Sequence, residues 1–183
     1  ATASHYQKLH TPELSLKTRM ACLRDLRDLG YQTGCGFMVG SPGQTPEDLV
    51  RDLRFLKEFR PHMVGIGPFL SHKDTPFREF PNGSGELTLF LLSLIRLLLP
   101  EVLLPATTAL GTLMPGGREQ GILHGANVVM PNLSPEDARH KYMLYDNKLS
   151  SGAEAAESVA LLRESLQRIG YQTAVSRGDS LVL

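Results

Sequence analysis

The sequence predicts an α/β protein whose parallel sheet corresponds to about half of a larger barrel. Helical and strand-like segments alternate along the 183 residues, with strands roughly 30 to 40 residues apart, which is typical of βαβ units. The strand-like segments are short apolar runs, as expected where helices cover both faces of a parallel sheet. A closed eight-stranded α/β barrel needs ~250 residues, so the predicted strands fit roughly half of one.

The first two helices are marked by their end residues. Leucines and a methionine at near-helical spacing predict a helix over Leu16–Leu29, and Gly30 supplies its stop. Thr45 caps the next helix, with Pro46 at the first helical position, and this helix ends before Pro61. The sequence thus favours two regular helices on either side of a strand.

The remaining elements follow from the same kinds of pattern. The other predicted helices are Leu87–Leu99, Arg118–His124, a helix from Ser134 through Leu144, and Ala155–Arg168. The predicted strands are Tyr31–Val39, Met63–Phe69, Val102–Ala106, Ala126–Met130 and a weak last strand, Tyr171–Ser176. The segments Leu29–Thr33 and Ile169–Thr173 share the motif Gly-Tyr-Gln-Thr, which indicates a common turn after a helix rather than a repeat array.

Composition excludes several functional classes. The 19 basic and 19 acidic residues give a formal charge of zero, which argues against nucleic-acid binding. The apolar run Leu87–Leu99 is too short to cross a bilayer, which needs ~20 residues, and Ser93 and Arg96 interrupt it. No signal peptide opens the chain. We therefore expect a cytoplasmic protein without a membrane partner.

The sequence offers no metal site of its own. Cys22 and Cys35 are the two cysteines, and they form neither a Cys-x-x-Cys pair nor a four-ligand set. The six histidines are scattered without ligand spacing, so we assign no metal to them. Two buried thiols in a reducing compartment are the simplest interpretation.

Polar residues gather where the predicted strands end. Thr107 and Thr108 follow one strand and Asn132 follows the next, and ligands of parallel sheets bind outside the carboxyl ends of strands. Gly40–Thr45 lies between a strand and a helix, which suits an anion but is also typical of a plain capped turn. Glycines at 65 and 67 would let a flat group approach the backbone, or would allow tight helix packing.

Nine short strings together resemble one known family. They are HYQKLH at 5–10, GYQTG at 30–34, FMVGSPGQT at 37–45, MVGIGPF at 63–69, DTP at 74–76, PATTA at 105–109, PGGRE at 115–119, GANVVMPN at 125–132 and YMLY at 142–145. The chain resembles the HydE-type FeFe-hydrogenase maturases, which are radical SAM enzymes related to biotin synthase and methylornithine synthase. The resemblance runs from Thr2 to about Lys148.

The resemblance implies the C-terminal half of a (βα)8 radical SAM barrel over 1–150, with its closing segment, and a helix-strand extension over 151–183. It implies S-adenosylmethionine and a 4Fe–4S cluster as cofactors and an organoiron complex of cysteine as substrate, used during H-cluster assembly. The implied cofactor-binding residues are Arg19, Met63, Gly65, Gly67, Pro68, Met130 and Tyr142, and the implied substrate-binding residues are Thr107, Thr108 and Tyr145. Catalytic residues stay unassigned.

The departures from the family pattern concern the cluster. The family's Cys-x3-Cys-x2-Cys loop is absent from these 183 residues, so we expect the chain alone neither to ligate the cluster nor to act as an enzyme. The expected partners are the N-terminal half of the barrel or a second copy, together with other hydrogenase maturases. Two alternatives stay open: a separate α/β module that binds a small anion, and a split-barrel subunit that needs a partner chain.

Overall fold

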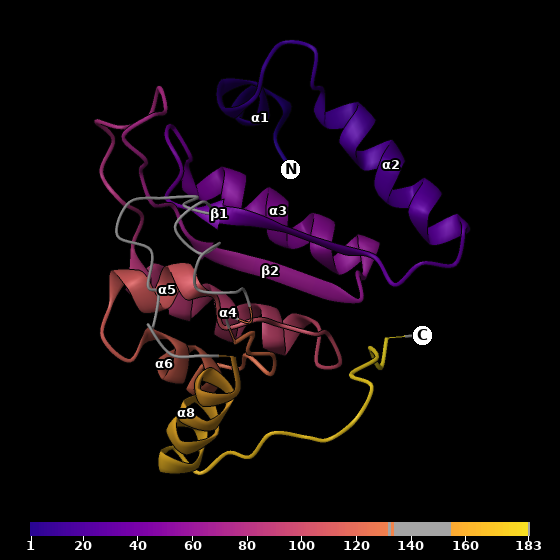
Figure 1. The fold of residues 1–183 in the computed structure, drawn as a ribbon. Helices are drawn as coiled ribbons and strands as arrows, with labels where there is room; N and C mark the ends of the chain where they lie inside the picture. The colour runs from indigo at the N-terminus through magenta and orange to yellow at the C-terminus, as the bar shows by residue number, and fades with distance from the viewer. Residues whose placement is uncertain (132, 134–154, 183) are drawn as a thin grey trace.

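The computed structural model of the protein describes residues 1–131, 133 and 155–182. Figure 1 shows a small parallel sheet with helices packed against it. The helices of the described part are α1 (Ala3–Leu9), α2 (Leu16–Asp28), α3 (Pro46–Phe59), α4 (Gly85–Leu98), α5 (Thr108–Leu113), α6 (Gly117–Leu123) and α8 (Ala155–Arg168). The strands are β1 (Gly34–Val39) and β2 (Met63–Pro68).

The two strands lie parallel, which confirms the predicted direction of the sheet. Their register runs from Gly34 opposite Met63 to Val39 opposite Pro68. Because α3 connects them, the unit is the βαβ crossover that the order of elements predicts.

The sheet direction continues through two further extended segments. The amide of Val64 donates to the carbonyl oxygen of Leu103 at 2.9 Å, and Met63 and Leu103 form a parallel bridge. A second parallel bridge joins Pro105 to Val128. The predicted strands Val102–Ala106 and Ala126–Met130 thus take their expected places as bridged segments rather than as full strands.

The main core lies between the sheet and helices α3 and α4. Val64 and Ile66 of β2 are almost fully buried, and they share one cluster with Leu56 of α3 and with Leu92 and Ile95 of α4. In Figure 1, α3 lies beside β1 and α4 lies beside β2. This packing covers one face of the sheet.

A second, smaller cluster ties α8 to the last bridged segment. Ala106, Ile122 and Ala126 are buried together with Leu166 of α8. After α8 the chain returns to the amino ends of the strands, where the terminal residues lie in Figure 1. There the amide of Ser180 donates to Gln32 Oε1 at 3.0 Å, and the Ser180 hydroxyl donates to the carbonyl of His62 at 3.2 Å.

The shared Gly-Tyr-Gln-Thr motif forms the same turn twice. Gly30 and Gly170 have φ angles of 83° and 82°, a left-handed conformation that glycine adopts without strain. The following tyrosine amides donate back to Leu26 and Leu166 at 3.0 and 2.9 Å. This six-to-one bond is a Schellman ending, so the predicted common turn is confirmed.

The predicted last strand, Tyr171–Ser176, is wrong. The segment forms no ladder because it lies away from the sheet, and Val175 is 97% exposed. The sequence also did not predict α1 and α5 as helices. The helix predicted from Ser134 through Leu144 lies outside the described residues, as does the boundary predicted after residue 150. The half-barrel architecture therefore stays a prediction, although the parallel α/β organisation is confirmed.

No helix in the described part of the chain is both long and apolar enough to cross a membrane.

Candidate functional site

One face of β2 carries two glycines and leaves the backbone uncovered at Gly65. Met63, Gly65 and Gly67 occupy alternate positions, so they lie on one face, and Gly65 is exposed. Their partners in β1 are Gly34, Gly36 and Met38, of which all three are exposed. We call these six residues the open face.

Pro68 lies on the other side of the same strand. Alternation places it with Val64 and Ile66, and it is buried like them. The structure thus groups three of the four candidate residues of this strand and separates the fourth.

Glycine is required at two points of the open face. A Cβ atom on Gly36 would overlap the carbonyl group of Gly65 on the neighbouring strand. A Cβ atom on Gly67 would lie 2.7 Å from Thr107 Oγ1, closer than side chains normally approach. A Cβ atom on Gly65 would meet no atom within 4 Å. The open face therefore excludes a side chain at Gly36 and Gly67 and has room for one at Gly65.

The two candidate threonines follow the first bridged segment. Thr107 is the N-cap of α5, and its hydroxyl oxygen accepts a hydrogen bond from the amide of Leu110 at 3.4 Å. Thr108 is the first residue of α5, and both threonines are half-buried. A hydroxyl that accepts one bond still has its proton to donate, so Thr107 can bind a carboxylate beside Gly67.

Arg19 lies elsewhere on the molecule. It is exposed in the first turns of α2, and with Arg27 its charge acts on the thiol of Cys35. Within the described residues, no hydrogen bond or ion pair joins its guanidinium to Met63 or Gly65. The structure brings Arg19 near β1 but not onto the open face.

The other candidates are only partly described. Met130 is 59% exposed and follows the segment whose Val128 pairs with Pro105. Tyr142 and Tyr145 lie outside the described residues, as does Asn132.

The loop Gly40–Thr45 is a self-contained capped turn. Thr45 and Asp48 form a reciprocal capping box, and Pro46 begins α3. The Gln44 side chain accepts from the amide of Gly40 at 2.7 Å and donates to the carbonyl of Met38 at 2.9 Å. The amides of Gly40, Gln44, Thr45 and Asp48 are thus bonded inside the loop.

Charges of both signs lie at this turn, because the Lys8 ammonium is near Gly43. Hydrogen bonds from Thr2 and then Thr45 lower the pKa of Asp48 to about 2, so its carboxylate stays ionised. The predicted small-anion site at Gly40–Thr45 therefore stays a prediction.

Neither cysteine suits an iron–sulfur cluster. Burial raises the pKa of Cys35 to about 11, against the lowering effect of Arg27 and Arg19, so this sulfur is a thiol at neutral pH. Cys22 is exposed on α2, so the expectation of two buried thiols is wrong for this residue, because it does not lie on the side of the helix that packs inward. No cluster of three or more metal-binding side chains occurs in the stretches that the structure describes.

Sequence reasoning missed Gly34 and Gly36 of the open face. The signal was available in the Gly-Cys-Gly spacing at 34–36, because alternate glycines leave one strand face bare. The contact between Gly67 and Thr107 had no sequence signal, since it depends on how the third segment packs.

Comparisons with known proteins find three relatives that match most of the chain. No family model matches it. The [FeFe] hydrogenase maturase subunit HydE of Thermotoga maritima is 46% identical over 159 residues, which cover 87% of this chain and 46% of that protein. The 3-methylornithine synthases of Methanosarcina acetivorans and Methanosarcina barkeri are 28% and 29% identical over 92% and 84% of the chain, or 46% and 43% of their own lengths. The chain spans about half the length of these curated relatives.

Proposed function

The chain is a relative of the HydE-type [FeFe] hydrogenase maturases over 159 of its residues, and from that premise we propose that it forms the C-terminal half of a radical SAM barrel. In this proposal the open face lines the cavity for S-adenosylmethionine and substrate. The observation that carries it is the bare strand face around Gly65, which ends beside the Thr107 hydroxyl at the carboxyl end of the sheet.

The open face fits the cofactor by shape. The space before Gly65 contains no protein atom within reach of a Cβ, so a flat adenosyl group can lie against the backbone there. Met63 and Met130 supply polarisable contacts beside it. Arg19 and Tyr142 stay proposed cofactor residues, because a guanidinium pairs well with the cofactor's carboxylate. When bound and reduced by one electron from the cluster, S-adenosylmethionine would supply the radical chemistry of the family.

The threonines fit the substrate by hydrogen bonding. Thr107 keeps a hydroxyl proton that can donate to a carboxylate oxygen, and Thr108 adds a second hydroxyl on the next residue. We propose that these two, with Tyr145, hold the carboxylate of a cysteine-type organoiron substrate by neutral hydrogen bonds. Such bonds orient the substrate without a fixed counter-charge.

The cluster has to be held by another segment. The raised pKa of Cys35 and the isolation of Cys22 do not fit thiolate ligands of iron, so we derive no step of the chemistry from them. We propose that a Cys-x3-Cys-x2-Cys loop on the N-terminal half supplies the ligands, and that the 183 residues alone do not cleave S-adenosylmethionine. Other hydrogenase maturases are the proposed partners of the complete barrel.

The proposal is tested by reconstitution. The chain is mixed anaerobically with an N-terminal HydE segment that carries the three-cysteine loop, and reductive cleavage of S-adenosylmethionine is followed as 5′-deoxyadenosine. We expect cleavage by the mixture and none by either part. A mixture that forms a complex with an intact cluster yet leaves S-adenosylmethionine uncleaved would show that the proposal is wrong.

A matched pair of variants locates the cofactor. Gly65→Val places a branched side chain where a Cβ meets no protein atom, so folding is preserved while the cofactor is excluded. Ser176→Val makes a comparable change on the exposed terminal segment. We expect the first to lose cleavage at least tenfold and the second to retain it.

A further inference from the structure

Helix α4 carries apolar side chains on its inner and its outer side, which is unusual for a helix at a protein surface. Its inner side carries Leu89, Leu92 and Ile95 into the core. Its basic residue, Arg96, turns inward: Nε donates to the carbonyl of Gly125 at 2.8 Å, and Nη1 donates to the carbonyl of Pro100 at 2.7 Å. Its outer side is therefore left without a positive charge.

The outer side presents a continuous apolar stripe. Leu87, Phe90, Leu97 and Leu98 are exposed on this side, and Leu94 lies between them, partly buried against the main core. These five residues are three or four positions from a neighbour in the set, and we call them the α4 seam. Phe90 is 58% exposed and Leu97 is 78% exposed. Apolar side chains grouped in this way mark an interaction surface, whereas single exposed leucines do not.

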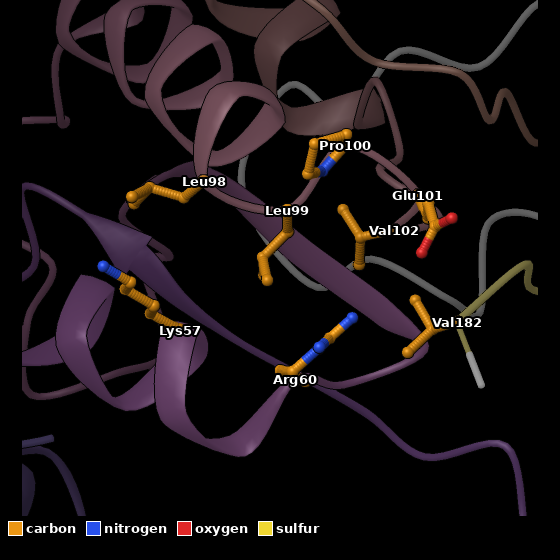
Figure 2. Close-up of a pocket in the computed structure, with 8 residues that line it drawn as sticks. All are labelled: Lys57, Arg60, Leu98, Leu99, Pro100, Glu101, Val102 and Val182. Carbon is orange, nitrogen blue, oxygen red and sulfur yellow. The ribbon is translucent and has the colours of Figure 1, made fainter.

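The α4 seam has an acidic residue at one end and a basic residue near the other. Glu86 lies in the first turn of α4, immediately before Leu87. At the other end, Leu98 and Lys57 line the same cavity of about 270 Å³, as Figure 2 shows. Neither Glu86 nor Lys57 takes part in an ion pair within residues 1–131, 133 and 155–182.

We propose that the α4 seam binds the α4 seam of a second copy of this chain, antiparallel across a two-fold axis. In that register Leu87 faces the partner subunit's Leu97, and Phe90 faces the partner subunit's Leu94. Glu86 then meets the partner subunit's Lys57, and the symmetry makes this ion pair twice. Antiparallel pairing also sets the dipoles of the two helices favourably.

Other occupants fit the seam less well. A membrane surface attracts basic residues beside an apolar helix face, whereas Glu86 flanks this one and Arg96 is turned inward. The N-terminal half of a barrel would pair with the edge of β1, and α4 packs against β2 instead. A parallel arrangement of two copies would place the Glu86 carboxylates together.

Sedimentation velocity on the chain, from about 1 to 200 μM, tests the proposal. We expect a monomer–dimer equilibrium, and we expect Phe90→Glu and Leu97→Glu each to raise its Kd at least tenfold, because each buries a charge in the seam. Leu161→Glu on α8, at a leucine that is 48% exposed, is the matched control and should leave the Kd unchanged. Circular dichroism melts check that each variant is folded.

The charge pair tests the register. Glu86→Lys and Lys57→Glu should each weaken the dimer about threefold or more, and the double variant should restore it. A wild-type monomer at every concentration would overturn the proposal, and so would equal association by the Phe90→Glu/Leu97→Glu double variant. Failure of the charge-reversed double variant to recover would overturn the antiparallel register.

Discussion

Replacing Gly67 with alanine tests the close approach that builds the candidate site. The new Cβ would lie 2.7 Å from Thr107 Oγ1, about 0.7 Å inside the 3.4 Å at which ordinary contact begins. The threonine cannot rotate away freely, because its hydroxyl caps α5 by accepting from Leu110. Crowding of this kind costs typically 1–3 kcal/mol, partly offset by the ~0.5–1 kcal/mol that alanine gains over glycine in a strand. We expect Gly67→Ala to lower the free energy of unfolding by about 1–2 kcal/mol.

A double-mutant cycle separates this contact from a general effect of alanine. Thr107→Ala removes the crowded hydroxyl and costs about 1 kcal/mol for the lost cap. The double variant should cost little more than Thr107→Ala alone, so the two effects should couple by about 1–2 kcal/mol. Gly65→Ala is the control and should change stability by less than about 0.5 kcal/mol, since its Cβ meets no atom within 4 Å. Urea unfolding followed by circular dichroism measures all four, and additive effects at positions 67 and 107 would refute the contact.

Three further predictions concern single side chains. Because hydrogen bonding lowers the pKa of Asp48 from 3.8 to about 2, its stabilisation is present above pH 4 and is lost as the pH falls toward 2. Asp48→Asn should lower the free energy of unfolding by about 1 kcal/mol at pH 7 and flatten the acid limb of stability measured in urea. Arg60 ends α3 with a φ of 48°, so Arg60→Gly should raise the free energy of unfolding by about 1 kcal/mol, and a loss in thermal melts would contradict this. Exposed Cys22 should react with a thiol reagent at pH 8 within minutes while Cys35, with its pKa of about 11, reacts only on unfolding; two fast equivalents would count against this burial.

The elements with strong local signals were predictable. The start of α3 could be predicted from the sequence because Thr45, Pro46 and Asp48 act within one turn. The structure shows the full capping box. The repeated Gly-Tyr-Gln-Thr turn could be predicted because its conformation depends on one local feature, a glycine with a left-handed backbone. The parallel direction followed from the spacing of elements, which depends little on side-chain detail.

Elements that depend on distant partners were not predictable. Tyr171–Ser176 has the composition of a strand, but no strand edge lies beside it, so it stays extended and exposed. The short helix α5 begins where the sequence suggested only polar strand ends, because Thr107 caps it. Arg19 could be assigned from family resemblance, yet its place depends on how α2 packs, and here it lies near Cys35.

The candidate site was predictable in its residues and only partly in its geometry. Gly65 and Gly67 stood out as glycines inside an apolar strand, and the structure places both on the open face. Pro68 follows Gly67 directly in the sequence. Side chains alternate along a strand, however, so Pro68 points to the core and not to the open face.

Hydrogen exchange at β1 tests most directly whether this sheet is one side of a larger barrel. The carbonyls of Thr33 and Val39 accept from the β2 side, so by alternation the amides of Gly36 and Met38 point away from β2. We predict that these two amides exchange quickly in the chain alone and at least tenfold more slowly after binding of an N-terminal HydE segment, as a new strand pairs with β1. Unchanged exchange at both amides in a formed complex would contradict the barrel.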